Sequence, residues 1–323
     1  MFAVYADRTS TDEPLAGLVV GERPEPEAPA GWTTVRVRAA SINHHDYWSL
    51  QGVGLPDERL PMILGCDAAG VADDGSEVVV HSVISDPSWT GDETLDPKRS
   101  LLSERHQGTF AELVRVPSRN VLAKPDGLSF EEAACLPTAW LTAYRMLFTQ
   151  SRLRPGDSVL VQGAGGGVAT AAIVLARAAG LRVFATSRDD GKRARAEQIG
   201  AHEVFETGGR LPHRVDAVIE TVGADTWSHS IKSLRPGGTL VIAGATSGVT
   251  PEVGELNRVF FLQLRIQGST MGTREELRGL AAFLVLSGVA PLIDWTLPME
   301  RAPEGLAAIA AGDVFGKIVL TTP

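Results

Sequence analysis

The pattern of apolar and polar positions changes near residue 124. Before that point, short apolar runs such as residues 33–39 and 77–80 are separated by loops rich in proline and glycine, and no helical period is sustained. This part of the chain is predicted to form a small, mostly β, barrel-like domain. The polar stretch 86–106 is expected to be an exposed excursion from it, because prolines and a glycine interrupt it.

After residue 124, apolar strands and helices alternate. Ser129 and Glu132 have the spacing of a capping box, which predicts a helix over residues 130–134. The alternation predicts a doubly wound parallel sheet of the Rossmann type, and the fold class is therefore α/β. The tail, residues 289–323, returns to strand–helix–strand. The predicted strands are 159–161, 181–186, 215–221, 238–244 and 264–269, and the predicted helices between and after them are 168–179, 225–234 and 274–286.

The segment 158–187 has the size and order of a dinucleotide-binding crossover, with the turn GAGGG at residues 163–167 between a strand and a helix. A side chain in this turn would hold the backbone away from a pyrophosphate, and the start of the helix offers free N–H groups to an anion. The spacing departs from strict G-x-G-x-x-G, and a flexible strand–helix connection is the alternative interpretation. The residues predicted to bind the pyrophosphate are Gly165, Gly166, Gly167 and Val168.

Composition narrows the function classes. The chain has 323 residues, of which 44% are hydrophobic and 21% charged, which is typical of a globular α/β protein. The formal net charge of −9 argues against nucleic acid or an anionic membrane as the main partner. The start of the chain does not resemble a signal peptide, and the apolar stretch 280–293 is too short to span a bilayer, so we expect a cytoplasmic protein. Cys66 and Cys135 are the only cysteines, which excludes a disulfide framework.

A series of short motifs runs in order through nearly the whole chain. They are ASINHHD at 40–46, ILGCDAAGV at 63–71, GTFAE at 108–112, LPTAWLTAY at 136–144, the glycine-rich turn, LRPGG at 234–238 and FGKIVL at 315–320. In their joint order they resemble the medium-chain dehydrogenase/reductase superfamily, in its quinone-oxidoreductase-like branch. The resemblance implies a GroES-like mostly-β catalytic domain (1–123 and 289–323), a Rossmann NAD(P)-binding domain (124–288), and a cleft for nicotinamide cofactor and substrate.

The chain departs from the zinc enzymes of that superfamily at their ligand positions. Those enzymes have cysteine where this chain has Asn43, Gly-His-Glu where it has GCD at 65–67, and often cysteine where it has Thr138. The cysteine and aspartate of 65–67 could each ligate zinc together with a histidine of 40–46, but adjacent residues on a strand point to opposite faces. The cysteines of the structural zinc lobe are absent from 86–106. We therefore expect no metal site.

The resemblance also suggests which residues contact the substrate and the cofactor. Asn43, Tyr47 and Thr138 are predicted to donate hydrogen bonds to the substrate oxygen on which negative charge develops. Asp46 could instead satisfy local backbone groups, and Cys66 is expected to be a small buried residue rather than a nucleophile. The further residues assigned to the cofactor are His44, for which a surface role is the alternative, Thr142, Gly244, Ser269 and Lys317.

The end of the second Rossmann strand suggests which cofactor is bound. Ser187 and Arg188 stand there, about 20 residues after the turn, where an acidic residue would bind the ribose 2′-hydroxyl of NAD. Serine and arginine, with Lys192 one turn on, suit the 2′-phosphate of NADPH better. The alternative is a solvated basic helix face over residues 188–195. We predict NADPH as the cofactor.

These inferences predict an NADPH-dependent reductase of a small-molecule quinone or α,β-unsaturated carbonyl compound that works without a catalytic metal. An alcohol dehydrogenase, zinc-dependent or otherwise activated, is one alternative. A non-catalytic NADPH-binding protein is the other. We also expect a homodimer, because the apolar run VFFL at 259–262 precedes the last strand of the predicted sheet and would form an edge worth burying.

Overall fold

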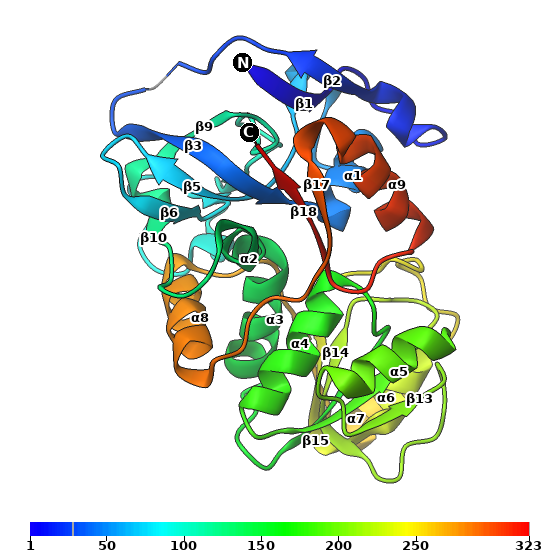
Figure 1. Cartoon of the computed structure of the whole chain (residues 1–323). Helices are drawn as coiled ribbons and strands as arrows, with labels where there is room; N and C mark the ends of the chain where they lie inside the picture. Colours follow the sequence, from blue (N-terminus) through cyan, green and yellow to red (C-terminus); the bar gives the residue numbers. More distant parts are fainter. Residues whose placement is uncertain (28, 323) are drawn as a thin grey trace. The chain divides into compact units, whose positions relative to one another are not determined.

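The computed structural model describes residues 1–27 and 29–322, which form two compact units (Figure 1). One unit is Met1–Leu141 with Met271–Pro323, and the other is Thr142–Thr270. The sequence analysis placed the boundaries at 123/124 and 288/289. The boundaries differ because helix α2 (Phe130–Ala134) packs on the sheet of the first unit, and α8 (Arg274–Ser287) also belongs to that unit. Pro323, the last residue of the expected first domain, lies outside the described residues.

The first unit is built on a seven-stranded sheet in which every neighbouring pair is antiparallel except β17 and β18. The order is β10-β6-β5-β3-β18-β17, and β9 also pairs with β3. Buried valines, leucines and isoleucines of these strands form the core. The strands are β3 (Trp32–Ser41), β5 (Asp67–Ala72), β6 (Glu77–Val80), β9 (Leu113–Pro117), β10 (Val121–Ala123), β17 (Ile293–Pro298) and β18 (Lys317–Thr321).

Smaller elements complete this unit. Strand β1 lies between β2 and β4, and β7 pairs with β8. The short helix α1 contacts α9, which joins β17 to β18. The bounds are β1 (Phe2–Ala6), β2 (Leu18–Glu22), α1 (His44–Leu50), β4 (Met62–Ile63), β7 (Val83–Ile84), η3 (Glu93–Leu95), β8 (Ser100–Leu101), η5 (Leu136–Trp140) and α9 (Ala302–Ala311), with the 3-10 turns η1 (Pro14–Gly17), η2 (Asp57–Arg59), η4 (Ser118–Asn120) and η7 (Met299–Arg301).

Two expectations for this unit need correction. Helix α1 interrupts a region in which no helical period is visible, because it has only seven residues and its start depends on a local cap: the Asn43 N–H donates to Asp46 Oδ2 at 2.8 Å. The stretch 86–106 is not wholly exposed. Glu93 and Ser103 are among its buried residues, since the chain folds back through β7, η3 and β8 instead of extending into solvent.

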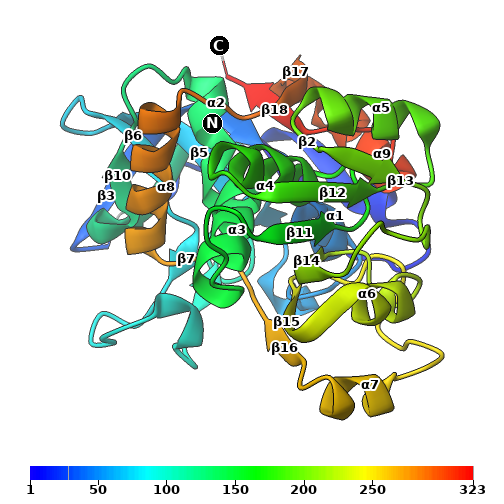
Figure 2. The same ribbon diagram turned by 90° about the horizontal axis from the view of Figure 1, so that it is seen from below.

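The second unit contains six parallel strands in the order β13-β12-β11-β14-β15-β16, which confirms the predicted doubly wound sheet. The chain runs outward from β11 in both directions. Right-handed crossovers therefore place α4 and α5 on one face and α6 on the other (Figure 2). The bounds are α3 (Leu141–Tyr144), η6 (Arg145–Gln150), β11 (Ser158–Val161), α4 (Gly167–Ala178), β12 (Arg182–Thr186), α5 (Asp190–Gln198), β13 (Glu203–Phe205), β14 (Val215–Glu220), α6 (Trp227–Ser233), β15 (Leu234–Ile242), α7 (Leu256–Phe261) and β16 (Arg265–Gly268).

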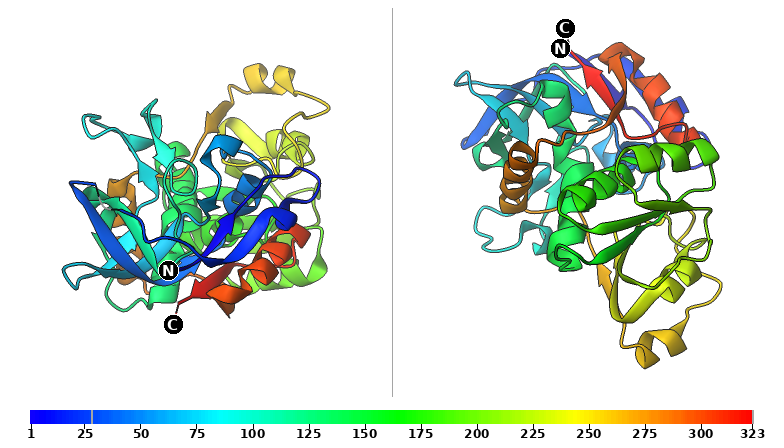
Figure 3. Two further views of the ribbon diagram at one scale, coloured as in Figure 1. Left: turned by 90° about the horizontal axis from the view of Figure 1, so that it is seen from above. Right: turned by 60° about the horizontal axis from the view of Figure 1, so that its bottom comes forward.

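Helix α7 stands at the outer edge of the second unit, beyond β16 (Figures 2 and 3). Phe260 and Phe261 on this helix are 70% and 79% exposed, and Ile266 on β16 is 41% exposed. Within the described residues, β16 pairs only with β15, so its other edge is unpaired. Across residues 1–27 and 29–322, no helix has both the length and the apolar character needed to cross a lipid bilayer.

Candidate functional site

The carboxylate of Asp67 is the centre of a buried hydrogen-bond network in the first unit. Asp67 begins β5 and pairs across the sheet with Ser41, the last residue of β3. The Ser41 hydroxyl and Asn43 Nδ2 each donate to Asp67 Oδ2 at 2.8 Å. The Thr138 hydroxyl, from η5, donates to Asp67 Oδ1 at 2.6 Å. The fold thus satisfies both oxygens of a fully buried carboxylate with three neutral donors.

Lys317 places a positive charge beside this carboxylate. It begins β18, the strand that pairs with β3 on the side opposite β5. Its Nζ donates to Ile42 O at 2.7 Å and to Asn43 Oδ1 at 2.6 Å, and lies 3.7 Å from Asp67 Oδ2. Burial raises the pKa of the Asp67 carboxyl, while Lys317 and the three donors act in the opposite direction. The Lys317 side chain is only 2% exposed, so its positive charge interacts with groups of the protein rather than with solvent.

The network changes the roles expected for Asn43 and Thr138. The Asn43 amide donates to Asp67 and to the Ser41 carbonyl, and its Oδ1 accepts from Lys317. The single hydroxyl proton of Thr138 is directed at Asp67. The structure therefore brings together Asn43, Thr138 and Lys317, but commits their donors to one another. Tyr47, which lies one turn after Asn43, is half-buried, and no described residue forms a hydrogen bond with its hydroxyl.

His44 lies on the same helix as Tyr47. Its half-buried ring is tilted against Trp48, with centroids 5.9 Å apart. Burial lowers the pKa of His44, and the nearby Lys317 lowers it further, against a smaller opposing effect of Asp46. The imidazole is therefore neutral at pH 7 and able both to donate and to accept a hydrogen bond.

The glycine-rich turn of the second unit is open at the start of α4. Gly166 is the N-cap of this twelve-residue helix, and a Cβ added there would meet no atom within 4 Å. Gly165 has φ +148, and a Cβ added there would come within 2.9 Å of Lys192 Cδ and 3.3 Å of its Nζ. The turn thus requires glycine at 165, and places a lysine beside free helix N–H groups. Gly167 and Val168 are the first two residues of the helix.

The end of β12 holds the residues predicted to select the cofactor. Arg188 is exposed, and no described residue pairs with its guanidinium. Ser187 is buried, and its hydroxyl accepts from the Asp189 N–H at 3.2 Å. The nearest acidic residue, Asp189, is occupied as the N-cap of α5, because its Oδ1 accepts from the Lys192 N–H at 2.7 Å. The Asp189 carboxylate, next to the end of β12, therefore caps helix α5.

The remaining residues predicted for the cofactor lie elsewhere in the second unit. Gly244 follows β15, where an added Cβ would lie 3.1 Å from the Thr221 carbonyl oxygen after β14. Ser269 follows β16, and its buried Oγ has no hydrogen-bond partner. Thr142 is buried at the first position of this unit. Gly244 and Ser269 thus follow neighbouring strands of the sheet, at the edge where doubly wound folds bind ligands.

Comparison with known proteins identifies the family. Residues 29–126 match the alcohol dehydrogenase GroES-like domain, and residues 167–285 match the zinc-binding dehydrogenase family. Acryloyl-coenzyme A reductase of Metallosphaera sedula is 28% identical over 95% of this chain and 97% of its own length. Quinone oxidoreductase of Mus musculus is 27% identical over 88% of each chain. A crystal structure of an NAD-dependent alcohol dehydrogenase is 35% identical over 100% of both chains, with a TM-score of 0.93.

The chain belongs to the medium-chain dehydrogenase/reductase superfamily. This membership confirms the expected combination of a GroES-like domain with a Rossmann-like parallel sheet. It also makes the chain an oxidoreductase that works with a nicotinamide cofactor.

The residues of the second unit fit that cofactor. The open turn at Gly166 leaves room for a pyrophosphate at the start of α4, where backbone N–H groups and the helix dipole favour an anion. Lys192 and Arg188 add positive charge, and the unpartnered Oγ of Ser269 offers a hydrogen bond at the carboxyl end of the sheet. The Arg188 guanidinium and the Ser269 hydroxyl have the character of a site built for a ligand, because no described residue pairs with either of them.

The residues at the zinc-ligand positions do not fit zinc. Amide and hydroxyl groups replace the thiolates that zinc prefers, at Asn43 and Thr138. The Asp67 carboxylate already accepts three hydrogen bonds and faces the Lys317 ammonium group. The Cys66 sulfur lies apart from this network, 3.3 Å from His45 Nδ1. A metal here would have to displace Lys317 and break hydrogen bonds to a buried carboxylate.

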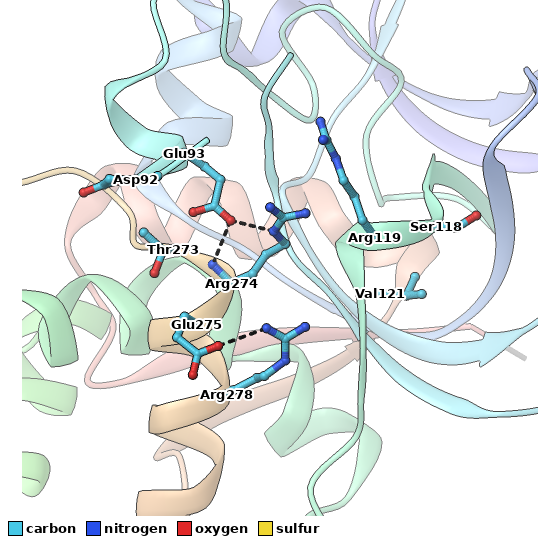
Figure 4. A pocket seen from close by; sticks show the side chains of 10 residues that line it. Asp92, Glu93, Ser118, Arg119, Val121, Thr273, Arg274, Glu275 and Arg278 are labelled. Carbon is cyan, nitrogen blue, oxygen red and sulfur yellow. Dashed lines mark hydrogen bonds and ion pairs between the residues drawn. The ribbon is translucent and has the colours of Figure 1, made fainter. Parts of the chain in front are cut away.

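A separate cavity of about 700 Å³ lies in the first unit, beside the start of α8 (Figure 4). Four of its charged side chains form two pairs: Arg274 donates to Glu93 at 2.5 Å, and Arg278 pairs with Glu275 at 3.2 Å. None of the residues predicted for the catalytic or cofactor site lines it.

Proposed function

We propose that the protein is an NADPH-dependent reductase that transfers hydride to a quinone or an α,β-unsaturated carbonyl compound without a catalytic metal. The buried pair of Asp67 and Lys317 carries this proposal. It puts a protein cation and a saturated carboxylate where zinc enzymes of the superfamily need free ligands.

The energetics of the two reaction directions favour reduction of an activated acceptor. Oxidising an alcohol requires an alkoxide-like oxygen, and zinc lowers the pKa of a bound water from about 16 to about 7. That change corresponds to about 12 kcal/mol, whereas one neutral donor supplies about 3–4 kcal/mol. A quinone or enone already carries a polarised carbonyl group. A metal-free site can therefore reduce such an acceptor with only a few hydrogen bonds.

The second unit would hold the cofactor through the start of α4, the exposed Arg188 guanidinium and the Lys192 ammonium group beside Gly165. The start of α4 and the turn at Gly166 bind the pyrophosphate, and Arg188 with Lys192 binds the 2′-phosphate that distinguishes NADPH from NADH. When bound, NADPH supplies the hydride. Asp189 does not compete for the ribose, because its carboxylate caps α5.

In the first unit, the Asp67 network would act as a support rather than as the reacting group. Lys317 and Asp67 fix the Asn43 side chain, and Asn43 begins α1. That helix carries Tyr47, whose hydroxyl is without a partner among the described residues. Tyr47 is therefore our candidate donor to the carbonyl oxygen on which negative charge develops. Solvent protonates the product oxygen or carbon after hydride transfer.

The named relatives lend support to this substrate class. Acryloyl-coenzyme A reductase and quinone oxidoreductase are names for enzymes that reduce activated double bonds and quinones. The 35% identical crystal structure, in contrast, is called an NAD-dependent alcohol dehydrogenase. This name makes alcohol oxidation the second candidate function. Because the name mentions NAD, the proposed preference for NADPH rests on residues of this chain such as Arg188.

A substrate panel with both cofactors tests the proposal. NADPH oxidation is followed with quinones, enones and enoyl thioesters, and NADP⁺ reduction with simple alcohols, with and without added zinc. We expect turnover with at least one activated acceptor, and none with alcohols. Alcohol oxidation that depends on zinc would establish the second candidate instead. Tight NADPH binding without turnover of any acceptor would favour a non-catalytic binding protein.

We also propose that two copies associate through the edge formed by α7 and β16. Phe260, Phe261 and Ile266 expose apolar surface there, and β16 has an unpaired edge. Sedimentation should give a dimer for the native chain and a monomer for Phe261→Glu. A native chain that sediments as a monomer at micromolar concentration would exclude this dimer.

A further inference from the structure

A second group of chemically reactive side chains lies beside the Asp67 network in the first unit. Three potential metal ligands, His45 Nδ1, Asp46 Oδ1 and Cys66 Sγ, all lie within 4.8 Å of one another. Cys66 and Asp46 are fully buried, and the His45 side chain is 18% exposed. The superfamily comparison assigns no role to this group as a set, and the proposed reduction does not use it.

The outer nitrogen of His45 has the partner that metal-bound histidines have. His45 Nε2 lies 3.2 Å from Glu104 Oε1, so a neutral ring donates its Nε2–H to that carboxylate. This tautomer leaves the Nδ1 lone pair facing Cys66 Sγ at 3.3 Å. Histidines that bind metals commonly have this arrangement. One ring nitrogen donates its N–H to a carboxylate, which fixes the ring, and the other nitrogen is left to bind the metal.

Asp46 supplies an independent observation. Its Oδ2 accepts from the Asn43 N–H, but its Oδ1 is buried and has no hydrogen-bond partner. That oxygen lies 3.9 Å from His45 Nδ1. A buried carboxylate oxygen left without a donor is costly unless a positive charge compensates it. A metal ion bound beside Asp46 Oδ1 would supply such a charge.

The distances suit a small tetrahedral ion. Around zinc, with Zn–S of about 2.3 Å and Zn–N or Zn–O of about 2.0–2.1 Å, neighbouring ligand atoms are about 3.3–3.6 Å apart. The 3.3 Å between Cys66 Sγ and His45 Nδ1 meets this requirement, and the 3.9 Å between His45 Nδ1 and Asp46 Oδ1 exceeds it by a few tenths of an ångström. The third pair, Asp46 Oδ1 and Cys66 Sγ, lies within 4.8 Å, so the Asp46 carboxylate would have to move toward a bound ion. Ser103 Oγ lies 3.7 Å from Cys66 Sγ, on a backbone with φ 64, and could complete the set.

We propose that His45, Asp46 and Cys66 bind one divalent metal ion of the zinc type, with Ser103 or a water in the fourth position. The site differs from that of the zinc dehydrogenases, because it shares only the Cys66 position with it. Its ion would join the start of α1 to the residues before β5, and so act as a structural clamp. On binding, the thiol loses its proton to solvent and a sulfur–metal bond replaces the S–H bond.

The metal-free state offers a competing cation, a proton on His45. Burial lowers the pKa of His45, but Cys66, Asp46 and Glu104 raise it, and the net direction is upward. A metal ion must therefore displace that proton as well as the thiol proton. An imidazolium that resists displacement is the outcome that would contradict the proposal.

Cobalt(II) substitution in the full-length protein distinguishes these states. The purified chain is treated with a chelator, dialysed, and titrated with Co²⁺ while the near-ultraviolet band of thiolate-to-cobalt charge transfer is recorded. We expect one equivalent to produce the band and Zn²⁺ to abolish it by competition. Cys66→Ser should remove the band. Cys135→Ser is the matched control, because Cys135 is the other buried cysteine of the first unit, and it should retain the band.

A second variant keeps the test valid if Cys66→Ser does not fold. Glu104 is partly exposed, and Glu104→Gln preserves the shape of the side chain while it removes the charge behind His45. This variant should weaken Co²⁺ binding by about 10- to 100-fold. The proposal is overturned if the native chain gives no charge-transfer band, if the band survives in folded Cys66→Ser, or if Co²⁺ binds with an octahedral spectrum alone, as at adventitious surface carboxylates.

Discussion

Polar groups are buried and paired in the Asp67 network, whereas around the glycine-rich turn some of them are exposed and lack a partner among the described residues. Around Asp67, three donors and the Lys317 ammonium group are buried and directed at one another. At the turn, the space before Gly166 is open, and just past the end of the neighbouring strand β12 the Arg188 guanidinium has no partner among the described residues. A buried group that the protein satisfies contributes to structure, whereas a group that it leaves unsatisfied is available for a ligand. The comparison predicts that mutations at the two places affect different measurements.

The largest effect is expected on stability when Lys317 is changed to Met. This change leaves the buried Asp67 carboxylate without its counter-ion, which costs about 3–5 kcal/mol in the free energy of unfolding. Urea unfolding measures the loss. Lys98→Met is the control, because Lys98 forms an exposed ion pair with Asp86, and its removal should change stability little.

The double variant Lys317→Met with Asp67→Asn sharpens this test. Removal of both charges should cost less than the sum of the single changes, with a coupling of at least about 1 kcal/mol. Additive single effects, or a loss of less than about 1 kcal/mol for Lys317→Met, would mean that the pair does not hold the network together.

The next effect should appear in catalysis, at Tyr47. If its free hydroxyl stabilises the developing oxyanion, Tyr47→Phe lowers kcat for an enone by about 10²-fold and leaves stability unchanged. A good quinone should be affected less, since it needs less polarisation. Steady-state kinetics with both acceptors measure the difference, and Tyr5→Phe serves as the control. Equal turnover of the enone by native protein and Tyr47→Phe would remove Tyr47 from the site.

Arg188→Ala should weaken NADPH binding by about 10- to 100-fold, the value of a charge-assisted hydrogen bond, and hardly change NADH binding. Stability should change little, because the guanidinium is exposed and has no hydrogen-bond or ion-pair partner among the described residues. Isothermal titration with both cofactors measures the preference, with Arg195→Ala as the control on α5. If the native chain binds both cofactors equally, the assignment of the 2′-phosphate to Arg188 fails.

The smallest expected effect concerns Gly166→Ala. Nothing within the protein opposes a Cβ at this position, so the free energy of unfolding should fall by no more than about 1 kcal/mol, the difference between glycine and alanine at an N-cap. The same Cβ occupies the space before α4, and should weaken NADPH and NADH alike by about tenfold, or 1.4 kcal/mol. Unchanged affinity for both cofactors would show that the pyrophosphate does not approach this turn.

Local patterns in the sequence predicted local structure well. The capping box at Ser129 and Glu132 is confirmed, with reciprocal hydrogen bonds of 2.8 and 3.2 Å. The strand–helix–strand order expected for residues 289–323 is confirmed by β17, α9 and β18. The glycine-rich turn could also be predicted, because Gly165 has a backbone angle, φ +148, that residues with a side chain rarely adopt. Each of these features depends on neighbours in the sequence, and periodicity or spacing reports such neighbours directly.

The Asp67 network could not be predicted in the same way. Its partners Ser41 and Thr138 are 26 and 71 residues away, and the Asn43 amide meets a lysine 274 residues further on. The residue types were visible, but the strand register that directs Asn43 and Thr138 at a carboxylate instead of at a substrate was not. Glu104 was missed for a related reason, since its polar surroundings in the sequence suggested an exposed loop.

The position of Lys317 also bears on how the chain folds as it is synthesised. The second unit is one continuous segment, whereas the first unit takes β18 from residues 317–321 and inserts it between β3 and β17. On the ribosome, the Rossmann unit can therefore fold before the first sheet is complete. Until β18 emerges, residues 39–41 of β3 have no strand on the edge opposite β5, and Asp67 has no counter-ion. During that interval, the nascent chain exposes an open strand edge of the kind that aggregates and that chaperones bind.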